Sequence, residues 1–283
     1  MDFDGTCTQI PEIYKLFMAQ YLDGLNKTVF TDSPVMMQEW VEAQSLVRSH
    51  SPQAAWTFTF TPAAPAAADP YIFSSECAKF LLRKKGITKE VPGEVFGNAS
   101  TANPAPWRNE ARSVFETILN QNIRLTFISN TNSATITDRL KTLLSVKDLP
   151  NGLSVKSSAE KYKITELVFD SKIPADLQKQ FQQLPPVHAH TQIGRPVYMR
   201  RGMYFEAICA AFNNDLSRLP TTVFCGDIWE MDLAMPYQLG ANINLVERAS
   251  PFDTYEYEYK ASLADPKRGK VSNDLTGLLE WIK

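Results

Sequence analysis

From about Trp107 to the end of the chain, short apolar segments alternate with longer segments whose apolar residues recur every three or four positions. The short segments predict strands, and the longer ones predict helices that bury one face. The expected strands are Ile123–Ile128, Leu153–Val155, Val197–Met199, Thr222–Phe224 and Asn242–Val246. The expected helices are Glu110–Asn120, one beginning after Ser133, Glu160–Phe169, Ala175–Gln183, Tyr204–Phe212, Met231–Leu239 and Leu275–Ile282. We expect Phe252–Tyr259 to be a strand or loop packed on the core. This alternation predicts an α/β fold with three layers and a mainly parallel sheet.

Residues 9–106 break the alternation, and helix-like periodicity dominates them. The expected elements are two or three amphipathic helices between Pro11 and Gln44, a strand over Ala55–Thr61, a surface connector over the Pro- and Ala-rich Pro62–Pro70, and a helix over Ser74–Lys85. We therefore predict two domains: a core made of residues 1–8 and 107–283, and a mainly helical domain, residues 9–106, inserted into it.

The composition narrows the class of partner. The chain has 283 residues, of which 44% are hydrophobic and 21% are charged, as in ordinary globular proteins. Its 29 Lys and Arg residues against 31 Asp and Glu residues give a net charge of −2, so no overall basic field favours nucleic acid or an anionic membrane. Small molecules are the expected partners. The four cysteines are far apart and no secretory leader pattern is visible, which predicts reduced thiols and a cytoplasmic location.

Two acidic pairs follow predicted strands. Asp2 and Asp4 lie in MDFDGT, where the Gly-Thr pair allows a sharp turn, and Asp227 and Asp232 lie in VFCGDIWEMD. The carboxyl ends of parallel strands meet at one edge of a sheet, so these carboxylates should crowd into one crevice. A cation would make this crowding tolerable. An all-oxygen ligand set favours Mg²⁺, with a substrate phosphate completing its coordination shell.

Two further segments are typical of phosphate-handling sites. The strand in RLTFISNTN ends at Ser129 and Asn130, where the hydroxyl and the amides at the start of the next helix could bind a phosphoryl oxygen. Arg200 and Arg201 precede another predicted helix, where a guanidinium could neutralise charge that develops on a transferring group.

These four segments resemble, in order, the four motifs of the haloacid dehalogenase superfamily, and in particular its aspartate-nucleophile phosphatases. The resemblance covers residues 1–8 and about 107–283. It implies a Rossmann-like core, with residues 9–106 where the superfamily inserts a substrate-selecting cap.

The resemblance also implies a role for each candidate residue. Asp2 would be the nucleophile that becomes an aspartyl-phosphate, and Asp4 would protonate the leaving oxygen and then activate water. Ser129 and Asn130 would bind phosphate, and Arg200 or Arg201 would replace the usual Lys of the third motif. The expected Mg²⁺ ligands are Asp2, Asp4 through its backbone carbonyl, Asp227 and Asp232. The implied activity is Mg²⁺-dependent hydrolysis of a small phosphorylated metabolite.

Alternatives remain open at this stage. A dehalogenase would need neither the acid at Asp4 nor a metal, and a third possibility is a weakly active or inactive binding protein that keeps the fold. Only Met1 precedes Asp2, so the strand that delivers the nucleophile is expected to be a stub. We favour a chain that begins upstream over an inactive form. His188 and His190 could bind a metal, but a loop without metal is the expectation because no third ligand is in view.

Overall fold

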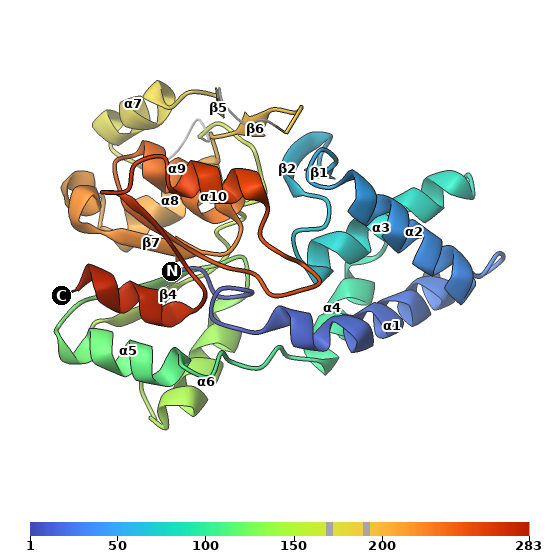
Figure 1. The fold of residues 1–283 in the computed structure, drawn as a ribbon, viewed down its shortest axis with the longest axis horizontal. Helices are drawn as coiled ribbons and strands as arrows, with labels where there is room; N and C mark the ends of the chain where they lie inside the picture. The colour runs from blue at the N-terminus through green and yellow to red at the C-terminus, as the bar shows by residue number, and fades with distance from the viewer. Residues whose placement is uncertain (168–171, 189–192, 283) are drawn as a thin grey trace. The chain divides into compact units, whose positions relative to one another are not determined.

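The computed structural model describes residues 1–167, 172–188 and 193–282 (Figure 1). The chain forms two compact units. The first unit contains Met1–Thr8, Trp107–Arg248 and Thr254–Lys283, and the second contains Gln9–Pro106 and Ala249–Asp253. The second unit thus includes a short segment, residues 249–253, that we expected in the core.

The first unit is a mixed α/β structure with two parallel ladders. Strand β3 (Leu125–Ile128) pairs in parallel with β4 (Leu153–Lys156). Strands β7 (Val223–Gly226), β8 (Asn242–Val246) and β9 (Gly269–Ser272) form the second parallel ladder, in that order.

The first two residues of the chain bridge these ladders. The amide of Ile128 in β3 donates to the carbonyl of Met1 at 2.9 Å, and the amide of Asp2 donates to the carbonyl of Cys225 in β7 at 2.8 Å. Asp2 is therefore anchored between β3 and β7, although the segment is too short to form a regular strand.

Helices cover both faces of the parallel strands. One face packs on α5 (Ala111–Asn120), α6 (Ser133–Leu144) and the 3₁₀ helix η3 (Leu275–Trp281), and the other packs on α8 (Gly202–Ala211), α9 (Ala234–Gln238) and α10 (Glu256–Ser262). Each face has its own buried apolar cluster, the first around Phe115 and Phe127 and the second around Phe205 and Leu245. The first unit consequently has three layers (Figure 1).

Several elements of the first unit differ from the sequence prediction. Residues 160–167 are not helical, and the rest of that predicted helix lies outside the described residues. Strand β6 (Val197–Tyr198) pairs antiparallel with β5 (Val187–His188) instead of joining the parallel strands, and α7 is Ala175–Gln183. The segment that we expected as a strand or loop contains helix α10, which buries Tyr257, Glu258 and Ser262.

The second unit contains four helices and a hairpin within its described residues: α1 (Ile10–Thr28), α2 (Met37–His50), α3 (Pro70–Lys84), α4 (Gly93–Ala102), β1 (Ala55–Phe58) and β2 (Thr61–Pro65). The surface connector predicted for Pro62–Pro70 is wrong. Strand β2 pairs antiparallel with β1, and residues 63–68 are buried, because alanine side chains are small enough for close packing.

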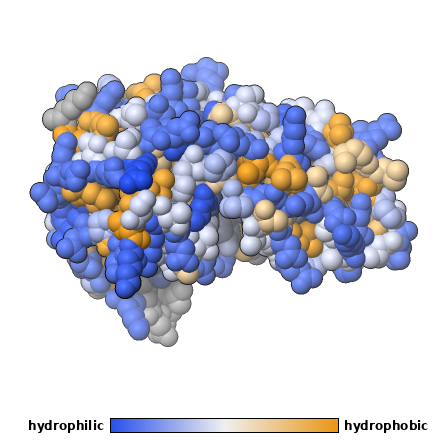
Figure 2. Space-filling model, turned by 90° about the horizontal axis from the view of Figure 1, so that it is seen from below, coloured by the Kyte–Doolittle hydropathy of each residue, from blue (hydrophilic) through white to orange (hydrophobic). Residues whose placement is uncertain are grey.

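Exposed apolar side chains are concentrated in the second unit. Among the described residues, the large exposed ones are Leu16, Met36, Met37, Val41, Leu46, Phe58, Phe60, Phe96 and, in the first unit, Leu263. On the face drawn in Figure 2, orange apolar residues form small groups among blue hydrophilic ones. The four cysteines are buried and form no disulfide. None of the helices in the described part of the chain has the length and apolar content needed to cross a bilayer.

Candidate active site

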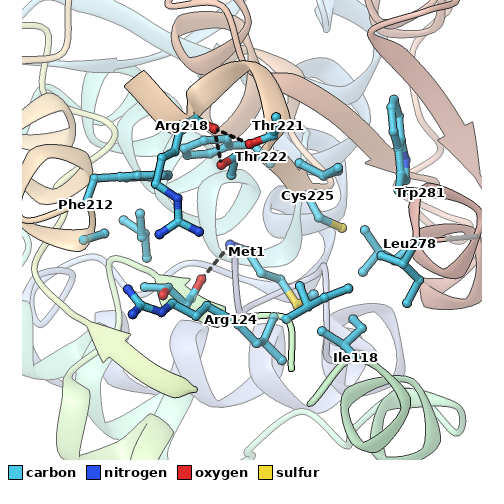
Figure 3. Close-up of a pocket in the computed structure, with 18 of the residues that line it drawn as sticks. Met1, Ile118, Arg124, Phe212, Arg218, Thr221, Thr222, Cys225, Leu278 and Trp281 are labelled. Atoms are coloured by element: carbon cyan, nitrogen blue, oxygen red, sulfur yellow. Dashed lines mark hydrogen bonds between the residues drawn. The ribbon is translucent and has the colours of Figure 1, made fainter. Parts of the chain in front are cut away.

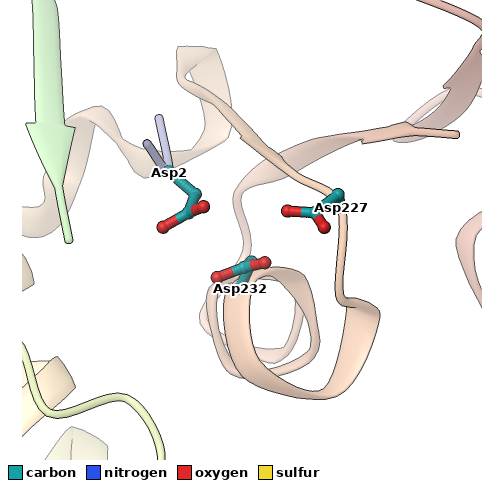
Figure 4. Close-up of side chains that lie close together, drawn as sticks. All are labelled: Asp2, Asp227 and Asp232. Carbon is teal, nitrogen blue, oxygen red and sulfur yellow. The ribbon is translucent and has the colours of Figure 1, made fainter. Parts of the chain in front are cut away.

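Three carboxylates meet at the carboxyl edge of the parallel strands. Asp2 follows the Met1 bridge, Asp227 follows β7, and Asp232 lies in the π-helix η2 (Trp229–Leu233). Each offers an oxygen, and these oxygens all lie within 4.8 Å of one another. Figure 4 shows the three side chains pointing toward a common centre. The structure thus brings together three of the four carboxylates that strand-end reasoning placed in one crevice.

Two glycines make this approach of carboxylates possible. Gly5 has a φ of +79°, and a Cβ on it would lie 2.5 Å from Oδ2 of Asp227. A Cβ on Gly226 would lie 2.3 Å from the Cβ of Asp232. Larger residues at either position would displace a carboxylate, because both distances are far inside van der Waals contact.

Thr6 connects the turn after Asp2 to the residue that follows β7 by a hydrogen bond. Its hydroxyl lies 2.8 Å from Oδ1 of Asp227 and 3.2 Å from Oδ2 of Asp2, so it can donate to either carboxylate. Asp232 is fixed separately, because the amide of Ile228 donates to its Oδ2 at 3.0 Å. The orientation of all three acids is therefore set by contacts within the first unit.

Lys161 lies among these acids, and the sequence analysis did not identify it. Its ammonium donates to Oδ1 of Asp2 at 2.6 Å and to Oδ1 of Asp232 at 2.9 Å, and the side chain is only 1% exposed. The residue follows β4, a strand paired in parallel with β3, so it reaches the same carboxyl edge. A search of the loops that follow each predicted strand would have selected Lys161 as a candidate.

Asn130 and Arg201 hold the backbone of Lys161. The amide of Lys161 donates to Oδ1 of Asn130 at 2.8 Å, and the guanidinium of the fully buried Arg201 donates to the carbonyl of Lys161. Arg200 points elsewhere: it donates to the carbonyls of Leu184 and Gln182. In the described part of the chain, the cation that forms ion pairs with Asp2 and Asp232 is therefore Lys161.

Burial shifts the ionisation of the cluster. Burial raises the pKa of Asp2 to about 7, against the opposing effect of Lys161. Burial, followed by the Asp232 and Asp2 carboxylates, raises the pKa of Asp227 well above its ordinary range. Burial alone would lower the pKa of Lys161, but the carboxylates of Asp2 and Asp232 outweigh it and raise the pKa above its ordinary value. Lys161 is thus protonated and in direct contact with two of the acids.

The cluster has the chemistry of a divalent-cation site. Three carboxylates share one buried ammonium, so the ionised cluster carries excess negative charge in a region of low dielectric. The ligand atoms that these three side chains offer are all carboxylate oxygens, which suit Mg²⁺. Asp2, Asp227 and Asp232 are the residues that fit this ion.

Asp4 and Ser129 lie beside the cluster. The hydroxyl of Thr131 donates to Oδ2 of Asp4, and burial raises the pKa of Asp4. Ser129 is buried, and its Oγ accepts a hydrogen bond from the amide of Thr131 at 3.1 Å. The loop after β3 therefore connects the predicted phosphate-binding Ser129 to the predicted acid/base Asp4.

Of the two histidines noted in the sequence, only His188 is described. Its ring contacts Trp229 edge to face, with centroids 5.2 Å apart. His190 lies outside the described residues.

Comparison with known proteins does not assign a family. No protein-family model and no curated protein matches the chain. Among solved structures, the chain is similar to the crystal structure of an L-2-haloacid dehalogenase, with 11% sequence identity and a TM-score of 0.41 over 100% of this chain and 97% of that chain. The reaction is therefore inferred from the geometry of the site.

Proposed function

We propose that this protein is a hydrolase of the haloacid dehalogenase type that acts as a Mg²⁺-dependent phosphatase on a small phosphorylated metabolite. The observation that carries the proposal is the contact of the Lys161 ammonium with both Asp2 and Asp232, beside Asp227. A nucleophilic carboxylate, a fixed cation and an oxygen-ligand set are the groups that phosphoryl transfer requires.

In the first step, an oxygen of Asp2 attacks phosphorus, and the bond from phosphorus to the leaving oxygen breaks. Asp4 transfers its proton to that oxygen. The raised pKa of Asp4 supports this role, because it keeps the carboxyl protonated closer to neutral pH. Lys161 offsets the negative charge on the phosphoryl oxygens.

In the second step, water attacks the phosphorus of the aspartyl-phosphate. The carboxylate of Asp4 accepts the proton of the water, the bond between phosphorus and the Asp2 oxygen breaks, and inorganic phosphate leaves. A bound Mg²⁺ would neutralise phosphate charge throughout. The residues that fit it are Asp2, Asp227 and Asp232, and we propose that Ser129 binds a phosphoryl oxygen.

The second unit, built mainly of helices, is proposed as the substrate-selecting cap. A phosphatase is favoured over a dehalogenase because carbon–halogen cleavage uses neither an acid at Asp4 nor a cluster of three metal-binding carboxylates. The contact of Thr131 with Asp4 and the grouping of Asp2, Asp227 and Asp232 both support phosphate chemistry.

The test is hydrolysis of a generic aryl phosphate with Mg²⁺ or with EDTA. We expect Mg²⁺-dependent release of phosphate and loss of turnover in Asp2→Asn. The matched control is Asp138→Asn, because Asp138 is exposed on α6 and is not one of the candidate site residues.

Two outcomes would overturn the proposal. Retention of more than about a tenth of the activity in Asp2→Asn would exclude the nucleophile, since loss of a covalent step costs orders of magnitude. Absence of turnover over a panel of phosphorylated metabolites, with Mg²⁺ bound, would favour a binding protein that keeps the fold.

A further inference from the structure

The π-helix η2, which carries Asp232, is enclosed by protein groups. All five of its side chains, Trp229–Leu233, are buried. The cavity of about 530 Å³ drawn in Figure 3 lies beside Met1, and the residues of β7 that line it, such as Cys225, precede η2 in the chain. The described residues of η2 are not part of the cavity lining. The position of η2 is therefore set by the side chains that pack against it.

Glu230 is the second acid of η2, and three hydrogen bonds hold its carboxylate. Nη1 of Arg195 donates to Oε2 at 2.9 Å, and Nη2 of Arg195 donates to Oε1 at 2.5 Å. The hydroxyl of Tyr257 also donates to Oε1, at 2.5 Å. The exposed fraction of the side chain is 0% for Glu230 and 8% for Arg195. Because a bidentate pair fixes the relative orientation of its two groups, Glu230 is held in one direction.

Glu230 and Asp232 anchor η2 on two different faces. They are two residues apart, and residues at this spacing in a helix do not face each other. Asp232 accepts from the Lys161 ammonium at 2.9 Å and from the amide of Ile228 at 3.0 Å, whereas Glu230 accepts from Arg195. The contact with Arg195 thus supports the side of η2 that faces away from the other acids.

Arg195 belongs to a segment that the proposed reaction does not use. It precedes β6, which pairs with β5 in the ribbon of Val187–His188 and Val197–Tyr198. His188 of β5 packs edge to face on Trp229, the residue before Glu230. The β5–β6 ribbon and the residue that leads into it therefore contact η2 at two successive positions.

A buried ion pair of this kind does more for geometry than for stability. The free energy lost when two charges leave water is about as large as the attraction gained, so apolar residues of similar volume often stabilise a fold equally well. Two parallel hydrogen bonds, in contrast, fix a distance and a plane, which apolar contacts do not.

We propose that Arg195 is a positioning residue, which acts through Glu230 to hold η2 in the geometry that directs the Asp232 carboxylate into the acid cluster. The inference rests on the proposed function in so far as Asp232 is a Mg²⁺ ligand. The orientation of Asp232 can be tested without metal.

Hydrogen exchange at the amide of Ile228 reports this orientation, because that amide donates to Oδ2 of Asp232. The amide of Ile243 in β8, which donates to the carbonyl of Arg268 at 2.8 Å, reports the stability of the sheet. In metal-free Arg195→Met, we expect exchange at Ile228 to accelerate at least about tenfold more than exchange at Ile243. Arg195→Lys should give an intermediate rate at Ile228, since an ammonium keeps the charge but cannot make the bidentate contact.

Arg200→Met is the matched control. Arg200 also lies next to β6, but it donates to the carbonyls of Leu184 and Gln182. Its replacement should change exchange at Ile228 and Ile243 by the same factor. Preferential acceleration at Ile228 in this control would overturn the proposal, because any change near the ribbon would then have the effect assigned to Arg195.

A second variant covers the case in which Arg195→Met does not fold. Tyr257→Phe keeps the ring and removes one donor to Glu230, and should accelerate exchange at Ile228 about threefold more than at Ile243. Equal acceleration of the two amides, in Arg195→Met or in Tyr257→Phe, would mean that the ion pair contributes only to global stability. That result would also overturn the proposal.

Calorimetric titration with Mg²⁺ connects the result to the proposed function. We expect the Mg²⁺ dissociation constant of Arg195→Met to be at least about tenfold above that of the wild type, the usual effect of removing a group that orients a metal ligand. An unchanged dissociation constant would exclude a role of Arg195 in the metal site. Absence of Mg²⁺ binding by the wild type would overturn the proposed function and not the orienting role of Arg195, since the exchange measurement uses neither metal nor activity.

Discussion

At the scale of single residues, the ammonium of Lys161 is the cation that contacts both Asp2 and Asp232 in the described part of the chain. Replacing it by Met keeps the side-chain length and removes the charge. We expect Lys161→Met to lower kcat/KM by at least about a hundredfold, because charge on the transferring group would lose its fixed partner.

Lys163→Met is the matched control for this change. Lys163 lies two residues away and pairs with Glu160, but its side chain is 30% exposed. Its replacement should leave kcat/KM nearly unchanged, since partly exposed ion pairs contribute little. Similar losses in the two variants would exclude a specific role for Lys161.

Gly5 provides a second prediction at this scale. An Ala at this position must adopt a φ of +79° and must also avoid Oδ2 of Asp227. Gly152 has a φ of +88°, but a Cβ there would meet its nearest atom at an ordinary 3.7 Å. Both variants carry backbone strain, and only Gly5→Ala adds a steric clash.

We expect urea unfolding to show Gly5→Ala less stable than Gly152→Ala by about 1 to 3 kcal/mol, the usual cost of overpacking. Equal losses of stability would mean that the turn relaxes away from Asp227 without cost.

At the scale of elements, α10 and the turn after β8 stabilise the π-helix that presents Asp232. Glu258 of α10 accepts a hydrogen bond from the amide of Trp229 at 3.0 Å and forms a buried ion pair with Arg248. The guanidinium of Arg248 also donates to the carbonyl of Asp227. The first half of the Asp227–Asp232 segment, at Asp227 and Trp229, therefore depends on one buried pair.

We expect Glu258→Gln to lower the free energy of unfolding by about 3 to 5 kcal/mol, because it leaves the Arg248 charge buried without its partner. A folded fraction of this variant should also need more Mg²⁺ for half-maximal activity. Glu256→Gln, on the same helix but 81% exposed at its side chain, is the control and should change neither quantity. An unchanged free energy of unfolding in Glu258→Gln would show that η2 does not depend on the Glu258 side chain.

The element scale also shows which features a sequence can predict. The apolar runs before Ser129 and Asp227 identify strand ends, and strand ends of a parallel sheet converge; the grouping of Asp2, Asp227 and Asp232 follows from that rule. Lys161 follows a predicted strand, which is a usable signal, but its contact with the acids depends on hydrogen bonds that its backbone makes with Asn130 and Arg201 in the folded chain.

Other differences arise where tertiary packing overrides composition. The Pro- and Ala-rich segment at residues 62–68 is typical of a connector, but its small side chains allow close packing on β1. Helix α10 has alternating aromatic and acidic residues that suggest a strand, whereas buried hydrogen bonds of Tyr257 and Glu258 favour a helix. Neither contact could be inferred from residues adjacent in sequence.

At the scale of the whole molecule, the buried acids make stability depend on pH, and we propose that Mg²⁺ changes this dependence. In the metal-free protein the pKa of Asp2 is raised from 3.8 to about 7, and those of Asp4 and Asp227 are also raised. Between the unfolded and folded pKa values the folded state binds more protons at these three groups, so their contribution to stability is greatest at low pH and is lost as pH rises. Lys161, in contact with Asp2 and Asp232, stays protonated through this range.

We expect Tm in EDTA to fall between about pH 5 and pH 8, through this proton linkage. Saturating Mg²⁺ should raise Tm most at the higher pH, because the ion binds the deprotonated carboxylates. Differential scanning fluorimetry at several pH values measures both effects, with Asp227→Asn as a variant that should respond less. A Tm in EDTA that rises over this range, with no effect of Mg²⁺, would contradict the interpretation of the cluster.

The connection between the two units determines how easily the second unit could be replaced by a domain of another protein. Thr8 and Trp107 pair as an antiparallel bridge, so the chain leaves the first unit and returns to it at one point. A graft of another protein's domain would need only to join two neighbouring backbone ends. Phe252 complicates such a graft: it reaches the second unit from a separate segment and packs on Tyr14 and Phe73, with ring centroids 5.1 and 5.8 Å apart. A transplanted domain would have to provide aromatic side chains that pack on Phe252, as Tyr14 and Phe73 do. This requirement restricts the choice of domain far more than the positions of the two backbone ends do.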